Sequence, residues 1–310
     1  MEQALSYGIT VAGQVVILFV LIFVGYLAGK FKLLKREGVN QMIDLLLYIV
    51  TPAVIVNAFA TVDYNKDTIG DFLFATLCAV LTHAVGIVFA LLFCKVKNID
   101  KQSVYRNCII FSNGGFMAIP LVFALAGEYG VFLVSPYIIT INVLLWIYGV
   151  RLFPKGKSAG KIKAVLNPGT VGVLLGLPLF LFVDNLPITV SQPIEYLANL
   201  NTPIAMIVTG FFLIGSDVIG GLKDIKLWSV STLRLVVIPL IMLLIFKVVF
   251  SLSGELLIAV AVPACAPCAV SNMMLSAKFG GDTSLASRLI SFTTILSMLT
   301  MPILLALTQI

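Results

Sequence analysis

The sequence predicts an all-α polytopic membrane protein with ten transmembrane helices in two inverted five-helix repeats. Three observations support this fold class: the composition, the placement of the basic residues and a repetition between the two halves of the chain. Of 310 residues, 60% are apolar or aromatic and only 11% are charged, and the mean hydropathy is +1.10. Soluble domains carry about a quarter charged residues, so this chain belongs in a lipid bilayer.

Ten apolar segments provide the predicted membrane helices. Each approaches or exceeds the length of about 20 residues that a helix needs to cross a bilayer. The segments run over about 9–29, 39–60, 69–94, 104–126, 130–153, 166–184, 194–216, 227–252, 256–279 and 283–308. The first lacks the positive stretch and the cleavage site of a signal peptide, so we expect a retained span.

Basic residues gather on one side of these predicted spans. When alternate connections are assigned to opposite sides, eighteen of the 20 Lys and Arg residues fall together, and only Lys66 and Lys247 fall opposite. By the positive-inside rule the basic side faces the cytoplasm, which places both termini outside the cell membrane. Such topology determinants do not indicate a nucleic acid partner. Arg234 and Lys247 lie toward opposite ends of the eighth segment, from which their long side chains can reach the membrane surface.

The two halves of the chain resemble each other and join at a basic stretch. Thr51-Pro52 in the second segment matches Thr202-Pro203 in the seventh, 151 residues later. This predicts a first repeat over residues 1–153, a cytoplasmic linker over 154–164 and a second repeat over 165–310. Because each repeat has an odd number of spans, the second is inverted, which is the plan of secondary transporters. A chance similarity of two apolar halves is the alternative.

The fourth and ninth segments are both interrupted near their centres. Proline removes a backbone donor and glycine lowers helix propensity, so we expect both helices to unwind there. Paired breaks in inverted halves indicate a substrate site, although a packing kink explains either break alone. The residues concerned are Asn113, Gly114, Gly115 and Pro120 in the fourth segment, and Pro263, Pro267, Ser271 and Asn272 in the ninth.

Interrupted helices leave half-helix N-termini inside the membrane. Their free N–H groups and partial positive charge suit a carboxylate, so a small organic anion is the expected substrate. Asn142 in the fifth segment and Thr294 in the tenth are further polar residues at mid-span. They either line the same cavity or form hydrogen bonds between helices.

The interrupted segments also carry a family resemblance. The stretch from Asn113 to Pro120 resembles the fourth-span motif of PIN-type auxin efflux carriers and of their bacterial relatives in the auxin efflux carrier family. Ala266-Pro267 followed by Ser276-Ala277-Lys278-Phe279 is similar to the ninth-span region of that family, and the likeness covers essentially the whole chain. The long cytoplasmic loop of the plant carriers is absent, and Ser271-Asn272 replaces more apolar residues.

The resemblance implies a mechanism and a substrate class. It implies that the broken fourth and ninth helices cross at the substrate site, with Asn113 on the substrate carboxylate and Pro120 and Pro267 at the crossing. The first, second, sixth and seventh spans would form a fixed scaffold, and the remaining spans a transport domain that moves as an elevator. A homodimer is implied as well. Bacterial relatives are associated with malate, malonate and similar acids rather than with auxin alone.

Other functions have less support from the sequence. A sodium-coupled bile-acid-type symporter of the same general fold is the main alternative, because carbonyl and hydroxyl oxygens alone can hold sodium. His83, the only histidine, is a candidate for proton gating or substrate contact, or a neutral ring bonded to a neighbouring helix. Cys265 and Cys268 lack the further ligands that a zinc site needs, so we expect no metal and no cofactor. An intramembrane enzyme would need a catalytic set, which is not evident, and a receptor role leaves the doubled breaks unexplained.

Overall fold

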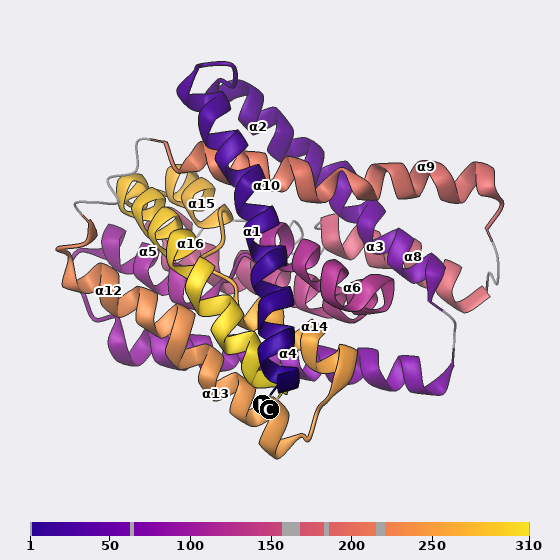
Figure 1. Ribbon diagram of the computed structural model, residues 1–310. Helices are drawn as coiled ribbons and strands as arrows, with labels where there is room; N and C mark the ends of the chain where they lie inside the picture. Colours follow the sequence, from indigo (N-terminus) through magenta and orange to yellow (C-terminus); the bar gives the residue numbers. More distant parts are fainter. Residues whose placement is uncertain (1, 63–64, 157–167, 183–185, 215–220, 310) are drawn as a thin grey trace.

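A computed structural model describes residues 2–62, 65–156, 168–182, 186–214 and 221–309, and it is all-helical over these residues (Figure 1). The first half contains α1 (Glu2–Lys30), α2 (Arg36–Leu45), η1 (Leu46–Val50), α3 (Thr51–Thr61), α4 (Lys66–Phe93), α5 (Ile99–Ile110), η2 (Gly114–Ala118), α6 (Ile119–Leu144), η3 (Leu145–Gly149) and η4 (Val150–Leu152). The second half contains α8 (Pro168–Phe182), α9 (Ile188–Asn199), α10 (Asn201–Phe212), α12 (Ile225–Thr232), η6 (Leu233–Val237), α13 (Ile238–Leu244), η7 (Ile245–Val249), α14 (Gly254–Cys265), α15 (Ser271–Phe279), α16 (Thr283–Ala306) and η8 (Leu307–Gln309).

Six helical stretches of the described chain are long and apolar enough to cross a membrane. They are Val11–Lys30, Arg36–Thr61, Lys66–Phe93, Gly114–Leu152, Ile225–Val249 and Thr283–Ala306. Each of the ten predicted segments contains helix, but α8 and α14 are shorter, and α5, α14 and α15 are parts of interrupted helices. An all-helical membrane protein is therefore confirmed, while the number of ten crossings stays a prediction.

Short polar side chains start four of the helices. Asn65 accepts a hydrogen bond from the Thr68 amide at 2.8 Å before α4, and Asn98 accepts from the Lys101 amide at 3.0 Å before α5. Asp224 and Asp282 cap α12 and α16 in the same way. Such caps satisfy first-turn N–H groups that have no partner within the helix, so they fix where each helix begins.

Proline widens three helices into π-helical turns. The π segments η1, η2 and η6 are followed two residues later by Pro52, Pro120 and Pro239, respectively. A proline has no N–H to donate and its ring clashes with the preceding turn, so the ladder of hydrogen bonds changes its spacing there. All three turns lie in segments that surround the crossing described below.

Gly127 divides α6 into two parts that run in different directions. Its backbone has φ 60° and ψ −155°, a region that essentially only glycine enters. Residues 119–126 therefore continue the interrupted fourth segment, and residues 128–144 provide most of the predicted fifth segment, which continues through η3 and η4. The bend lies in the gap between the predicted segments 104–126 and 130–153.

Glycines bring two pairs of helices into close contact. α1 packs along α10, where a Cβ on Gly25 would overlap the carbonyl of Ile207 and a Cβ on Gly210 would overlap the carbonyl of Ile22. α3 packs along α8, beside it at the right of Figure 1, where Gly172 lies against α3. Small residues allow such backbone approach, which drives helix association in lipid.

We predict that Gly210→Ala destabilises the protein, because its new methyl group would force α1 away from α10. Overpacking of this kind costs about 1–3 kcal/mol. Gly13→Ala is the matched control on α1, since nothing lies within 4 Å of the added Cβ. Thermal unfolding of the purified variants in detergent measures both effects. Equal unfolding midpoints for Gly210→Ala and Gly13→Ala would contradict the close contact.

Candidate functional site

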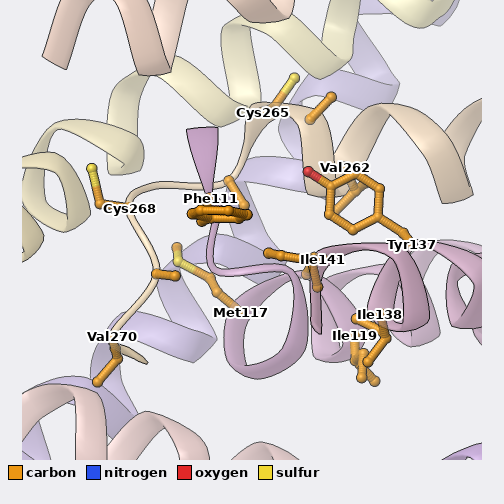
Figure 2. Close-up of a cluster of buried hydrophobic side chains, with 14 of the residues drawn as sticks. Phe111, Met117, Ile119, Tyr137, Ile138, Ile141, Val262, Cys265, Cys268 and Val270 are labelled. Carbon is orange, nitrogen blue, oxygen red and sulfur yellow. The ribbon is translucent and has the colours of Figure 1, made fainter. Parts of the chain in front are cut away.

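The two interrupted helices cross at their breaks. Residues 111–113 separate α5 from η2, and residues 266–270 separate α14 from α15. Ser112 and Cys268 form an isolated antiparallel bridge between these extended segments. Figure 2 shows Phe111 and Cys268 on the two segments where they pass each other. We refer to residues 111–113 and 266–270 together as the crossing.

Two reciprocal hydrogen bonds hold the crossing together. The Asn113 amide N–H donates to the Pro267 carbonyl at 2.7 Å, and the Ala269 amide N–H donates to the Phe111 carbonyl at 3.0 Å. Backbone groups freed inside a membrane must find partners in the protein, in a ligand or in water. Each extended segment thus supplies a hydrogen-bond partner for a backbone carbonyl of the other. Neither helix can therefore be interrupted in this manner alone.

Side chains from the neighbouring helices fix the crossing further. The hydroxyls of Ser112 and Tyr137 are 2.9 Å apart, and the Tyr137 hydroxyl is 3.5 Å from the Pro263 carbonyl. Figure 2 shows the Tyr137 hydroxyl directed toward the segment that carries Val262. On the other side, the Cys268 amide donates to the Thr293 hydroxyl at 3.3 Å. Tyr137 of α6 therefore links the first break to α14, and Thr293 of α16 anchors the second break.

Arg234 is completely buried against the ends of both interrupted helices. Its Nε donates to the Ala266 carbonyl at 3.1 Å, and its Nη1 donates to the Ile109 carbonyl at 3.4 Å. Its Nη2 donates to the carbonyls of Pro263 and Ala264. The expectation that Arg234 reaches the membrane surface was wrong, because these carbonyls hold the guanidinium inside the protein. Lys247 lies at the other end of the segment and donates to two carbonyls of η8.

A pocket of about 80 Å³ lies beside the crossing. Its wall combines η1 and α3, the start of the helix after the first break, α6 and the start of α15. The lining residues are Leu47, Thr51, Ser112, Asn113, Gly115, Phe116, Ile138, Ile141, Asn142, Leu145, Ala269, Val270 and Ser271. The structure thus brings Asn113, Gly115, Asn142 and Ser271 of the predicted site residues together. We call this cavity the crossing pocket.

Asn113 is the most distinctive polar group in the crossing pocket. Its side chain is only 4% exposed, and among the described residues its Nδ2 has no hydrogen-bond partner. Its own carbonyl accepts from the Met117 and Ala118 amides, so Asn113 begins the helix that continues as α6. α15 begins at Ser271 in the same pocket. Two helix N-termini with partial positive charge therefore face one cavity.

The other predicted site residues do not line the crossing pocket. Gly114 packs against the Tyr137 ring, which an added Cβ would approach to 3.0 Å, and Pro267 contributes its carbonyl to the crossing. Asn272 and Thr294 are fully buried. In the described part of the chain, the Asn272 Oδ1 and the Thr294 Oγ1 have no partner. Pro120 lines a different pocket.

That different pocket contains the carboxylate of Glu128, which falls between the predicted segments 104–126 and 130–153. Glu128 accepts a hydrogen bond from the Asn57 side chain at 3.0 Å. Asn201, 2% exposed, lines the same pocket, and no described residue is within hydrogen-bond reach of its side-chain amide. The pocket measures about 60 Å³ and lies between α3, α6 and the junction of α9 with α10.

His83 is buried in the middle of α4, close to the crossing. Its Nδ1 is 2.7 Å from the Ala79 carbonyl of its own helix, rather than bonded to a neighbouring helix as one expectation had it. A nitrogen that donates to a carbonyl carries the proton, so Nε2 is the bare nitrogen of the neutral ring. The ring packs against Tyr137, with centroids 4.8 Å apart.

Comparison with known proteins assigns the chain to a family. A family model described as "Membrane transport protein" matches residues 10–305. The chain belongs to this family of membrane transport proteins. The resemblance to the auxin efflux carrier family, first seen at the broken segments, is thereby confirmed.

Curated relatives of this transport protein come from methanogenic archaea. The chain is 23% identical over 300 residues to an uncharacterized transporter of Methanocaldococcus jannaschii, covering 92% of this chain and 94% of the relative. It is 23% identical over 290 residues to an uncharacterized transporter of Methanothermobacter thermautotrophicus, again covering 92% and 94%. The likeness extends over nearly the full length of each protein, so the crossing lies within the shared region.

We predict that Tyr137→Phe loosens the crossing. The substitution removes the hydroxyl beside Ser112 and the Pro263 carbonyl, which costs about 0.5–1.5 kcal/mol. The expected results are a lower unfolding midpoint and faster labelling of the buried Cys268 thiol by a maleimide, followed by mass spectrometry. Tyr48→Phe is the control, because Tyr48 is 67% exposed. Unchanged Cys268 labelling would show that the hydroxyl does not hold the crossing.

Proposed function

We propose that this membrane transport protein is a secondary transporter that moves a small organic anion, such as a carboxylate or an auxin-like acid. The observation that carries the proposal is the meeting of two helix N-termini in the crossing pocket, beside the Asn113 side-chain amide, for which the described part of the chain offers no hydrogen-bond partner. Because the Asn113 side-chain amide is already positioned at the pocket, its N–H group can bind a carboxylate oxygen without a rearrangement of the side chain. The N-terminal ends add a favourable charge for the anion.

Substrate contacts are proposed for the residues around the crossing. Asn113, Gly115, Asn142 and Ser271 would contact the anion directly, because they line the pocket. Gly114, Pro120, Pro267, Asn272 and Thr294 would shape the surroundings of the site or join it when the protein changes conformation. Transport requires no catalytic residue and no cofactor in this proposal.

Two inverted five-helix repeats are the proposed architecture. The contact of α1 with α10 joins the first predicted span to the seventh, and the contact of α3 with α8 joins the second to the sixth. An exchange of the two repeats converts one of these pairs into the other, as inverted symmetry requires. The repeats would cover residues 1–153 and 165–310. Most of the linker over 154–164 lies outside the described residues.

Elevator-type movement would give access to the pocket from both sides of the membrane. Leu47 and Thr51 of the crossing pocket come from the second predicted span, which belongs to the proposed scaffold, whereas Asn113, Asn142 and Ser271 come from the proposed transport domain. A substrate bound at this boundary would travel with the moving part and lose its scaffold contacts. A homodimer would keep the scaffold fixed in the bilayer.

We predict that Asn113→Ala weakens substrate binding and leaves the fold intact. Loss of a hydrogen bond to a charged ligand costs about 1.5–3 kcal/mol, or roughly ten- to hundredfold in affinity. The measurement is thermal stabilisation of the purified protein by a panel of mono- and dicarboxylates and indole acids, because a ligand of the folded state raises apparent stability. Asn40→Ala, at an exposed position of α2, is the control.

The outcomes separate the site from the substrate class. A carboxylate that stabilises the wild type and Asn40→Ala but not Asn113→Ala supports both parts of the proposal. Equal stabilisation of folded Asn113→Ala removes this residue from the site. Stabilisation by neutral or cationic solutes alone would reject the organic anion.

A second prediction concerns orientation in the cell membrane. Because the basic connections are assigned to the cytoplasm, we expect both termini outside and residues 154–164 inside. Green fluorescent protein, expressed in a bacterial host, should fluoresce when inserted in the linker and stay dark when fused to the C-terminus. Fluorescence of the C-terminal fusion would contradict the topology.

A further inference from the structure

We propose that Arg234 is a built-in cation of the crossing. Its guanidinium occupies the place where the C-terminal ends of the two interrupted helices would otherwise attract a mobile cation, so the crossing assembles without added sodium. The consequence for transport, that the anion binds without a coupling cation at this place, rests on the proposed function. The structural part of the proposal does not.

The contacts of Arg234 are those of a coordinated ion. Every nitrogen of the guanidinium donates to at least one main-chain carbonyl, and all four of these carbonyls lie at the last turns of α5 and α14 or directly after them. The side chain is fully buried. Within the described ranges, Arg234 has no ion pair with an aspartate or glutamate. Main-chain carbonyls therefore replace the carboxylate partner that a buried arginine ordinarily needs.

The charges balance in this arrangement. The C-terminal end of a helix carries about half a negative elementary charge, so two such ends that meet at one point offer roughly one. One guanidinium supplies one positive charge in a planar set of donors that can serve several oxygens at once. Carbonyls at the ends of broken helices are the groups that hold coupling cations in other transporters with interrupted helices. In this protein a side chain already occupies them.

The position of Arg234 also fits the repeat. His83 lies 151 residues earlier, the same offset that relates Thr51-Pro52 to Thr202-Pro203. Both side chains are buried in long helices beside the crossing, but His83 donates to its own helix, whereas Arg234 reaches the ends of α5 and α14. Arginine carries a permanent positive charge and histidine does not. At these matched positions the two halves are therefore chemically unequal.

Cation rescue tests the proposal without any organic anion. Thermal unfolding is followed for the wild type, Arg234→Ala and Arg234→Lys in choline chloride. In parallel samples, sodium chloride or a low, non-denaturing concentration of guanidinium chloride replaces part of the choline chloride. We expect the wild-type midpoint to be the same in choline and sodium. Arg234→Ala should unfold at a lower temperature and recover most of the loss with guanidinium, and part of it with sodium, because the emptied carbonyl site binds them.

The second variant keeps the experiment decisive if Arg234→Ala fails to fold. Arg234→Lys retains the charge but loses the planar set of donors, so it should fold with an intermediate midpoint and respond little to sodium. Arg151→Ala, at an exposed basic position of η4, is the matched control and should respond to neither cation. A merely structural arginine would leave a cavity that no cation refills.

Two results would overturn the proposal. One is a wild-type midpoint raised by sodium over choline in the absence of substrate, which would reveal a mobile cation site. The other is a folded Arg234→Ala protein of lowered midpoint that neither guanidinium nor sodium stabilises or, where Arg234→Ala does not fold, an Arg234→Lys protein that does not fold either. If the carboxylate panel fails while guanidinium rescue succeeds, the substrate class is wrong and the role of Arg234 stands. Any carboxylate that does bind should keep its effect in sodium-free choline chloride.

Discussion

The crossing of the two interrupted helices is the constraint on which the rest of this structure depends. A helix broken inside a membrane exposes N–H and carbonyl groups that lipid cannot satisfy. Here the Asn113 amide of the first break and the Ala269 amide of the second each donate to a carbonyl of the other break. Arg234 donates to further carbonyls at the helix ends. The surrounding helices contribute single polar groups, from Tyr137 and Thr293, at the same place. Neither break is stable without the other, so the two halves of the chain must fold onto each other.

The same geometry separates opposite charges. The carbonyl ends of α5 and α14 point at Arg234, while the N-terminal ends that begin at Gly114 and Ser271 border the crossing pocket. The negative ends are neutralised from within the chain, and the positive ends lie beside an asparagine amide that has no hydrogen-bond partner among the described residues. A site of this kind attracts an anion and has no need of a counter-cation at the crossing. The proposed preference for an anion and the burial of Arg234 thus follow from one arrangement.

Local sequence rules account for much of the fold. Apolar length located the helices, and proline and glycine located both breaks, because these effects depend on residues near each other in the chain. Asn113, Gly115 and Ser271 were predicted from the interrupted segments and Asn142 from its polarity at mid-span, and all four line one pocket. Thr51 was noticed only as a repeat marker, yet it lies on the pocket wall. Glu128 fell in a connection between predicted segments. Its hydrogen bond with Asn57 was not foreseen, because the two positions are 71 residues apart in the chain.

The sequence by itself determined the membrane environment, the helical fold, the interruption of two helices and the membership of a transport family. Only the tertiary structure decided that the breaks meet, that Gly25 and Gly210 bring α1 onto α10, and that Arg234 is buried. The physical reason is that a lone arginine among apolar residues favours the membrane surface unless acceptors are already collected inside. Those acceptors lie 125 residues away in α5 and about 30 residues away in α14. No pattern near Arg234 contains them, and only the crossing assembles them.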